Sequence, residues 1–250
     1  MESLFNGIYK GKTILITGHN GFKGSWLSFW LYKMGAKLHG IALNNYENSN
    51  HFQYLKSSII IEEHDLDIRN YSSIYDTVKK INPDIIFHLA AQTLVRESYE
   101  NPKYTFETNF LGTLNIFEAV RKSDIATCII NITTDKVYKN IEKKTAFKES
   151  DILGGHDPYS SSKVCSEILT VSYKKSFFNQ EKVLLSTSRA GNVIGGGDWA
   201  KDRLIPDIVR SLINNSTLNI RNPKAVRPWQ HVLDCVSGYL IQGTQLLSGN

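Results

Sequence analysis

Two patterns of apolar and polar residues take turns along this chain. Short apolar runs, such as Ile14–Ile16 and Asp84–Ala91, are typical of strands that are covered on both faces of a parallel sheet. The stretches between the runs carry apolar residues every three or four positions, which predicts amphipathic helices. We expect six strands, within 14–16, 37–43, 59–68, 84–91, 127–133 and 182–188.

The helices are expected directly after the strands. One carries Trp26, Leu27, Trp30, Leu31 and Met34 on one face, a short one covers 71–81, a long one follows Pro102, and another begins at Tyr159. Strands that alternate with helices in this way predict an α/β fold, a doubly wound parallel sheet with right-handed crossovers. Ligands of such sheets bind at the carboxyl ends of the strands.

The pattern changes after residue 188. We expect a glycine-rich loop over 189–199, a helix over 204–213, a short extended piece over 218–221 and a helix over 231–247. The sequence therefore predicts a nucleotide-binding domain over 1–188 and substrate-binding segments over 189–250.

A glycine-punctuated turn follows the first predicted strand. Gly18, Gly21 and Gly24 have G-x-x-G-x-x-G spacing. Missing Cβ atoms let such a turn fold tightly, approach a pyrophosphate and pack a helix on a strand, while the helix N-terminus attracts phosphate. A glycine triplet alone is weak evidence, but the strand before it and the helix after it favour dinucleotide binding over a purely structural turn.

The end of the second predicted strand lacks the acidic residue that usually holds the adenosine ribose. Asn44 and Asn45 stand there instead. The charge that favours NAD over NADP is therefore missing, although no arginine nearby favours NADP.

Composition narrows the function classes. The chain has 250 residues, 41% hydrophobic and 21% charged, as in globular proteins, and its net charge of +5 is scattered, which does not indicate nucleic-acid binding. Its three cysteines have no C-x-x-C spacing, which argues against a disulfide framework and a zinc site. No metal is expected. No stretch has membrane-spanning length and no signal peptide is evident, so we expect a cytoplasmic protein without a membrane partner.

A tyrosine and a lysine stand four residues apart in the predicted helix that precedes the sixth predicted strand. Tyr159 and Lys163 would share one helix face, so that the lysine charge can lower the phenol pKa and the tyrosine can take a hydroxyl proton. The Y-x-x-x-K pattern alone is common. Its position after Thr133-Thr134 and the fifth strand makes it strong evidence for oxidoreductase chemistry.

These motifs together resemble the extended short-chain dehydrogenases/reductases. Closer still, TGHNGFKGSWL, LAAQTLVRESY, DPYSSSK, RAGNVIGGGDWAKDRLIPD and RPWQHVLD resemble the CDP-glucose 4,6-dehydratase family. The resemblance runs from about residue 11 to about residue 239. Members of that family continue further to complete a C-terminal substrate lobe, so we expect this sequence to be truncated.

The resemblance implies a Rossmann fold with NAD as cofactor and assigns the site. Thr134, Asp135, Lys136, Tyr159 and Lys163 would be catalytic, with Asp135 protonating the hydroxyl that leaves C6 and Lys136 beside it. The cofactor-binding residues would be Gly18, Asn20, Gly21, Phe22, Lys23, Gly24, Asp67, Ile68, Ala90, Ala91, Gln92, Tyr159 and Lys163. Without the resemblance, Asp135 and Lys136 could be an ordinary surface pair and the alanines ordinary packing.

The substrate side follows from the same resemblance. Arg189, Asn192, Arg227 and His231 would contact the nucleotide diphosphate, each with a structural salt bridge or similar packing role as the alternative. The implied activity is a lyase that converts CDP-glucose, a nucleotide sugar, to CDP-4-keto-6-deoxyglucose for deoxysugar and polysaccharide synthesis, as a homo-oligomer. The alternatives are a related NAD-dependent sugar-nucleotide epimerase or reductase, and a non-catalytic dinucleotide-binding fragment.

Overall fold

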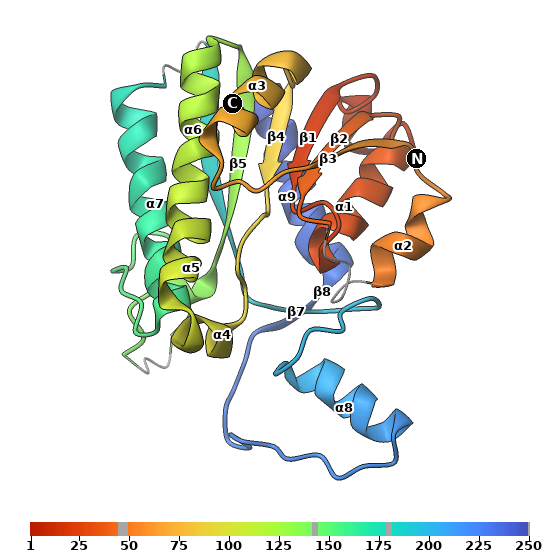
Figure 1. Ribbon diagram of the computed structural model, residues 1–250, viewed down its shortest axis with the longest axis vertical. Helices are drawn as coiled ribbons and strands as arrows, with labels where there is room; N and C mark the ends of the chain where they lie inside the picture. The colour runs from red at the N-terminus through yellow and green to blue at the C-terminus, as the bar shows by residue number, and fades with distance from the viewer. Residues whose placement is uncertain (45–49, 142–144, 179–181, 250) are drawn as a thin grey trace.

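The computed structural model describes residues 1–44, 50–141, 145–178 and 182–249 (Figure 1). Its centre is a sheet of six parallel strands in the order β3-β2-β1-β4-β5-β6. The strands are β1 (Thr13–Thr17), β2 (Lys37–Ala42), β3 (Ile61–Asp65), β4 (Ile85–His88), β5 (Thr127–Thr134) and β6 (Val183–Ala190). The predicted doubly wound parallel sheet is confirmed.

Helices cover both faces of the sheet. They are α1 (Phe22–Lys33), α2 (Asn50–Lys56), α3 (Tyr71–Ile81), α4 (Val95–Glu100), α5 (Pro102–Phe106), α6 (Gly112–Ser123), α7 (Pro158–Ser176), α8 (Leu204–Ile213) and α9 (Val232–Leu247). Short helical turns lie at η1 (Leu4–Gly7), η3 (Glu107–Leu111) and η4 (Asp135–Val137). The long helix expected after Pro102 is thus interrupted by η3, a π-helical turn.

Alternation along the strands divides the core in two. Ile14 and Ile16 of β1 pack with α1 and α9 on one face, whereas Leu15 packs with α3, α6 and α7 on the other. Both sets of side chains are fully buried. This two-sided burial is why the strands appear in the sequence as unbroken apolar runs.

The second part of the chain differs from the expectation. The boundary predicted at 188 falls inside β6, and α9 belongs to the core of the main body because Val232, Val236 and Leu240 are buried against α1 and the sheet. The predicted loop over 189–199 contains the end of β6 and also β7 (Asn192–Ile194), which pairs in parallel with β8 (Trp229–His231). Three-residue strands carry too little periodicity to be predicted.

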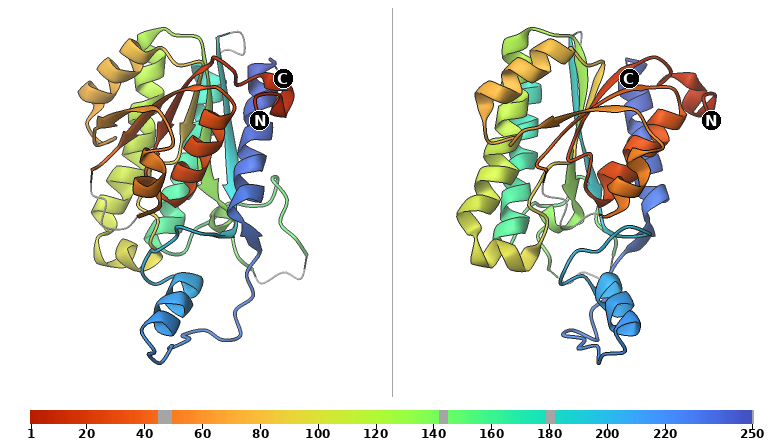
Figure 2. Two further views of the ribbon diagram at one scale, coloured as in Figure 1. Left: turned by 90° about the vertical axis from the view of Figure 1, so that its right-hand side faces the viewer. Right: turned by 45° about the vertical axis from the view of Figure 1, so that its right-hand side comes forward.

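The chain between β7 and β8 leaves the body and returns. It carries α8 and projects from the end of the sheet where β7 and β8 lie (Figures 1 and 2). The piece expected to be extended over 218–221 has no strand partner in the described residues. Among the described helices, none has both the length and the apolar character needed to cross a membrane.

Candidate active site

A cavity of about 560 Å³ lies between the main body and the excursion that carries α8. Five parts of the chain line it: the first turn of α1, the segment from the end of β4 into α4, the end of β5, the start of α7 and the segment after β6. These include Phe22, Lys23, Thr134, Lys136, Tyr159, Asn192, Arg203 and Arg227. The cavity therefore lies at the carboxyl ends of the strands, where a doubly wound sheet binds its ligands.

The start of α7 fixes Tyr159 and Lys163. Asp157 caps the helix by accepting a hydrogen bond from the Ser160 amide at 2.9 Å, and Pro158 occupies the first turn. Tyr159 and Lys163, one turn apart, are both buried. The predicted pairing of these side chains on one helix face is borne out by this geometry.

Their protonation differs from the expectation. Burial raises the pKa of Tyr159 to about 12, while a hydrogen bond from Thr134 and the positive charge of Arg203 act to lower it. Burial, together with the charge of Lys23, lowers the pKa of Lys163 to about 7. Lys163 is not among the groups that shift the pKa of Tyr159, and its amino group donates to the Ile132 carbonyl oxygen at 3.0 Å. Arg203 lowers the pKa of Tyr159 instead. Arg203 lies within one of the sequence motifs, but the motif did not indicate this role.

Asp135 and Lys136 stand in the η4 turn directly after β5. The Thr134 hydroxyl donates to Asp135 Oδ1 at 3.1 Å, and Lys136 Nζ lies 3.6 Å from the same oxygen. The Thr134 hydroxyl has only one proton, so it can donate a hydrogen bond to Asp135 or to an ionised Tyr159, but not to both. A Cβ at Gly191 would lie 3.6 Å from Asp135 Oδ2, which brings the segment after β6 against this carboxylate.

The three glycines of the turn have different structural roles. Gly18 has φ +71°, and a Cβ there would lie 2.8 Å from the Ala90 amide nitrogen. A Cβ at Gly24 would overlap the Gly18 carbonyl oxygen, so this glycine lets α1 pack on the turn. A Cβ at Gly21 would meet only the Gly18 oxygen, at 3.4 Å. Gly21 therefore leaves room on its outer side, and no side chain caps the first turn of α1.

The other residues of the turn hold neighbouring segments. Asn20 Nδ2 donates to the Leu43 carbonyl oxygen at 2.9 Å. Lys23 Nζ donates to the Tyr239 hydroxyl of α9 at 3.0 Å, and burial lowers its pKa. The backbone amide of Asn44 donates to Asp65 Oδ1, while Asn45 lies outside the described residues.

The ends of β3 and β4 supply the remaining predicted cofactor residues. Asp67 forms a forked ion pair with Arg69, with atoms 2.6 and 2.9 Å apart, and Ile68 is buried against Gly112. The Ala90 amide donates to Thr17 Oγ1 at 3.1 Å. Ala91 is half-buried beside it. The ion pair with Arg69 thus uses part of the hydrogen-bonding capacity of the Asp67 carboxylate.

A buried polar clamp orients Gln92. Asn109 accepts from the Gln92 amide at 2.8 Å and donates to the Gln92 carbonyl oxygen at 2.9 Å. Its amide also donates to Ser162 Oγ of α7 at 2.9 Å. The sequence did not reveal that Asn109 joins the β4 end to the helix of Tyr159.

The four predicted substrate residues separate into two pairs. Asn192 and Arg227 line the cavity, and Asn192 Oδ1 is buried without a hydrogen-bond partner in the structure. His231 accepts from the Leu233 amide at 3.3 Å and so caps α9. It is not among the cavity-lining residues.

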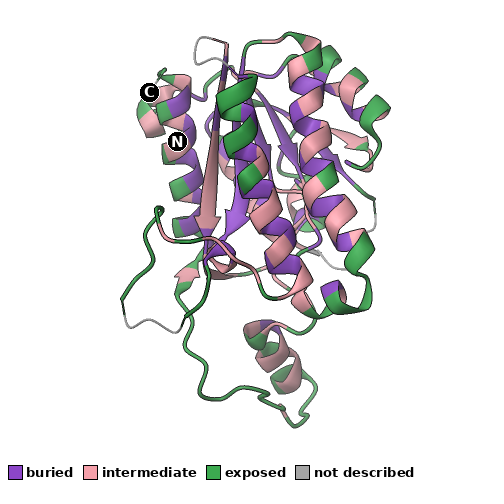
Figure 3. Ribbon diagram, turned by 90° about the vertical axis from the view of Figure 1, so that its left-hand side faces the viewer, coloured by how far each residue is buried: buried purple, intermediate pink, exposed green. Residues whose placement is uncertain are grey.

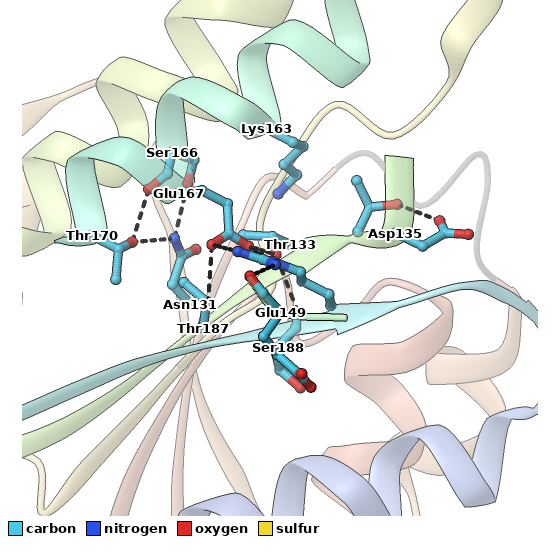
Figure 4. A network of polar contacts seen from close by, with 12 residues as sticks. Asn131, Thr133, Asp135, Glu149, Lys163, Ser166, Glu167, Thr170, Thr187 and Ser188 are labelled. Atoms are coloured by element: carbon cyan, nitrogen blue, oxygen red, sulfur yellow. Dashed lines mark hydrogen bonds and ion pairs between the residues drawn. The ribbon is translucent and has the colours of Figure 1, made fainter. Parts of the chain in front are cut away.

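Arg189 is engaged elsewhere. Its guanidinium forms two 2.9 Å bonds to Glu167 of α7 and lies over the Tyr138 ring. Glu167 also accepts from Thr133 and Thr187, so that the ion pair ties α7 to β5 and β6 (Figure 4). This arrangement is the structural salt bridge that was the alternative for Arg189.

Comparison with known proteins identifies relatives. Residues 15–245 match the family model described as GDP-mannose 4,6 dehydratase. A CDP-glucose 4,6-dehydratase of Salmonella typhimurium is 46% identical over 95% of this chain and 68% of its own length. A CDP-paratose 2-epimerase of Salmonella typhi is 30% identical over 90% of this chain and 73% of its own length. The solved dTDP-glucose 4,6-dehydratase of Bacillus anthracis, in complex with NAD, has a TM-score of 0.80 and 25% identity, covering 96% of this chain and 73% of that one.

Proposed function

Because this chain belongs to the GDP-mannose 4,6 dehydratase family, we propose that it converts CDP-glucose to CDP-4-keto-6-deoxyglucose. The 46% identity to a CDP-glucose 4,6-dehydratase supports both the cytidine base and the reaction. The observation that carries the proposal is that Thr134, Lys136 and Tyr159 line one cavity, and that Asp135 lies one hydrogen bond from Thr134. Dehydration needs such an acid beside the oxidising tyrosine, whereas epimerisation or reduction does not.

NAD is the proposed cofactor, and the glycine turn fits its pyrophosphate. Gly21 is open on its outer side, and the uncapped first turn of α1 offers amide groups for phosphate oxygens. Gly18, Asn20, Phe22, Lys23, Gly24, Asp67, Ile68, Ala90, Ala91 and Gln92 would complete the binding site. Bound there, NAD would supply the acceptor for the hydride that leaves C4 of the sugar and, once reduced, the donor of the hydride that C6 receives.

The oxidation half-reaction is assigned to Tyr159. Its phenol would accept the C4 hydroxyl proton, and an ionised phenol is required for this. The high pKa set by burial opposes ionisation, and Thr134 and Arg203 favour it. Lys163 would hold the nicotinamide ribose with its amino group, which already lies at the β5 end.

The elimination half-reaction is assigned to Asp135. The C4 ketone acidifies the C5 proton, and the Asp135 carboxyl would give its proton to the hydroxyl that leaves C6. Lys136 lies beside it but must lose its own proton before it can act as the C5 base. We therefore propose that Lys136 positions a water molecule that takes the C5 proton, or polarises the ketone.

The nucleotide would bind on the outer side of the cavity. Asn192 has a buried oxygen that still lacks a donor, and Arg227 is exposed at the rim, where a planar guanidinium can hold two phosphate oxygens. We propose no direct contact of the nucleotide with Arg189 or His231, because Arg189 is bound to Glu167 and His231 caps α9. The substrate-binding segment is then 191–231 rather than 189–250.

Two rival functions remain distinguishable. The epimerase alternative draws support from the 30% identity to CDP-paratose 2-epimerase. A non-catalytic dinucleotide-binding fragment would bind NAD without turnover. Incubation with CDP-glucose and NAD, followed by NMR of the sugar, separates a 4-keto-6-deoxy product from an epimer and from unchanged substrate.

The Asp135→Asn variant tests the division of labour. It keeps the shape of the side chain but removes the transferable proton, so we expect elimination to slow by roughly 10² to 10⁴ while oxidation survives. Reduced cofactor should then accumulate and be visible by its absorbance. Tyr159→Phe, the matched control, should give neither reduced cofactor nor product. Normal product formation by Asp135→Asn would remove the acid from the proposal.

Cellular setting and assembly are further parts of the proposal. All three cysteines are free, which suits the cytoplasm. Ile168 and Val171 stand on the outer face of α7 with more than half of each side chain exposed, at 59% and 51%, and Figure 3 shows this outer helical layer. Burial of that face would support a homo-oligomer. Light scattering of wild type and Val171→Glu tests it: a smaller species is expected for the variant.

A further inference from the structure

Two histidines and a glutamate meet on the sheet, outside the cavity. His39 lies on β2, and Glu62 and His64 lie on β3, the edge strand. In the parallel register His39 is opposite Glu62, and His64 is opposite Ile41. Because side chains alternate along a strand, all three project from the face that also carries Ile41. That is the face covered by α3.

The distances between the ligand atoms match a metal site. His39 Nδ1 lies 3.5 Å from Glu62 Oε2 and 3.5 Å from His64 Nε2, and His64 Nε2 lies 3.8 Å from Glu62 Oε1. A tetrahedral zinc ion with bonds of about 2.0 to 2.1 Å holds its ligand atoms roughly 3.3 Å apart. The two nitrogen atoms lie near different oxygens of Glu62, and one ligand atom from each of the three residues lies within 4.8 Å of the others. Small side-chain movements would bring all three residues onto one ion.

We propose that His39, Glu62 and His64 form a binding site for Zn²⁺ or a similar divalent transition metal ion. Two imidazoles and one carboxylate are a common set of zinc ligands, and three protein ligands leave a fourth position for water. The cysteine spacing had excluded a thiolate zinc site. This set comes from two neighbouring strands and has no sequence spacing of its own.

The surroundings favour the metal-binding form of the histidines. Their side chains are only 20% and 15% exposed, and burial is the main cause that lowers the pKa of each. Glu62 acts in the opposite direction, and Lys80 of α3 lowers both pKa values further. Glu62 is 57% exposed and gives the ion a path from solvent.

The site would fasten the edge of the sheet. Without an ion, the two rings are stacked with centroids 5.8 Å apart and share one long hydrogen bond. An ion would join β3 to β2 through side chains in addition to the backbone. None of the three ligands lines the cavity, so the role is structural.

Titration of the full chain with Zn²⁺ after chelator treatment tests the site. We expect one bound ion per chain and a higher melting temperature with Zn²⁺, because binding to the folded state alone stabilises it. Glu62→Gln and His64→Gln should weaken binding by at least about tenfold and abolish the shift in melting temperature. His156→Gln, an exposed histidine outside the cluster, is the matched control and should bind as wild type does.

Circular dichroism shows whether each variant is folded, so that loss of binding can be read as loss of a ligand. Absence of Zn²⁺ binding by the wild type at pH 7.5 would overturn the proposal. Equal affinity in wild type, Glu62→Gln and His64→Gln would overturn it as well, because the ion would then lie elsewhere.

Discussion

Burial governs the protonation of the residues at the cavity. Tyr159 and Lys163 lie in the same buried layer, and each is driven towards its neutral form, the phenol to a pKa of about 12 and the amine to about 7. From sequence, a charged lysine beside a tyrosine predicts an acidified phenol. The structure differs because Lys163 bonds to the Ile132 carbonyl and is itself desolvated.

Lys163 should make stability depend on pH. Its pKa is about 7 in the folded chain and near 10.5 when exposed, so between these values the unfolded chain binds more protons than the folded one. Stability therefore rises with pH across this window and the cost of burial is fully present below pH 7. The raised pKa values of Tyr159 and Cys128 make stability fall as the pH rises, but only above about pH 9.

Urea unfolding of the ligand-free protein at pH 7, 8 and 9 measures this effect. The wild type should gain about 2 kcal/mol from Lys163 over this range. Lys163→Met should show only the rise that comes from Lys23, whose pKa burial also lowers. An equal rise in both proteins would mean that Lys163 is charged in the folded state.

At the scale of elements, the turn between β1 and α1 uses its glycines for packing as well as for a ligand. Gly18 rests on the β4 end and Gly24 on the Gly18 carbonyl, whereas Gly21 has free space. The sequence predicted a tight turn, an approach to the pyrophosphate and helix packing for the triplet, without assigning each role to one glycine. The division between them depends on neighbours that are distant in sequence, such as Ala90, and so only the structure shows it.

Alanine at two of these positions separates the roles. Gly24→Ala should lower the free energy of unfolding by at least about 2 kcal/mol, because its Cβ would meet backbone that cannot yield. Gly21→Ala should fold almost normally yet bind NAD more weakly. Chemical denaturation and calorimetry measure the two effects. Unchanged NAD affinity in folded Gly21→Ala would mean that the pyrophosphate does not approach this glycine.

The ion pair between Glu167 and Arg189 joins α7 to the sheet. Glu167 is almost fully buried, so Glu167→Gln would leave the guanidinium of Arg189 without its counter-charge, at a cost of about 3 to 5 kcal/mol. A calorimetric melting curve should show a clearly lower melting temperature. Glu2→Gln, which breaks an exposed pair with Lys10, should leave it unchanged. Equal melting of Glu167→Gln and wild type would return Arg189 to the candidates for phosphate binding.

The pattern of apolar and polar residues predicted the regular elements. It failed for segments whose structure depends on contacts with distant parts of the chain. Strands such as β1, β4 and β5 are readable because burial on both faces leaves apolar runs, and α9 is readable from its own periodicity. In contrast, β7 and β8 are three residues each and exist only because they pair across some 35 residues of chain. The same limit applies to α9, whose helix was predicted but whose place in the main core was not.

At the scale of the whole molecule, the cavity is made by two regions that the sequence keeps apart. The body supplies Thr134, Lys136 and Tyr159, with Asp135 one hydrogen bond from Thr134. Asn192 of β7 and, from the excursion between β7 and β8, Arg203 and Arg227 supply the other side. Motif positions could be predicted because the resemblance covers them. The partners of Arg189 and His231 could not be predicted, since Glu167 and the first turn of α9 meet these side chains only in the folded chain.

The most direct test of the proposed reaction follows one hydrogen atom through it. CDP-glucose carrying deuterium at C4 is incubated with the protein and NAD, and the product is examined by mass spectrometry and NMR. Hydride that leaves C4 and returns to C6 of the same molecule predicts a 4-keto-6-deoxy sugar with deuterium at C6. Deuterium that stays at C4 in an epimer, or substrate that remains unchanged, would contradict the proposed dehydration.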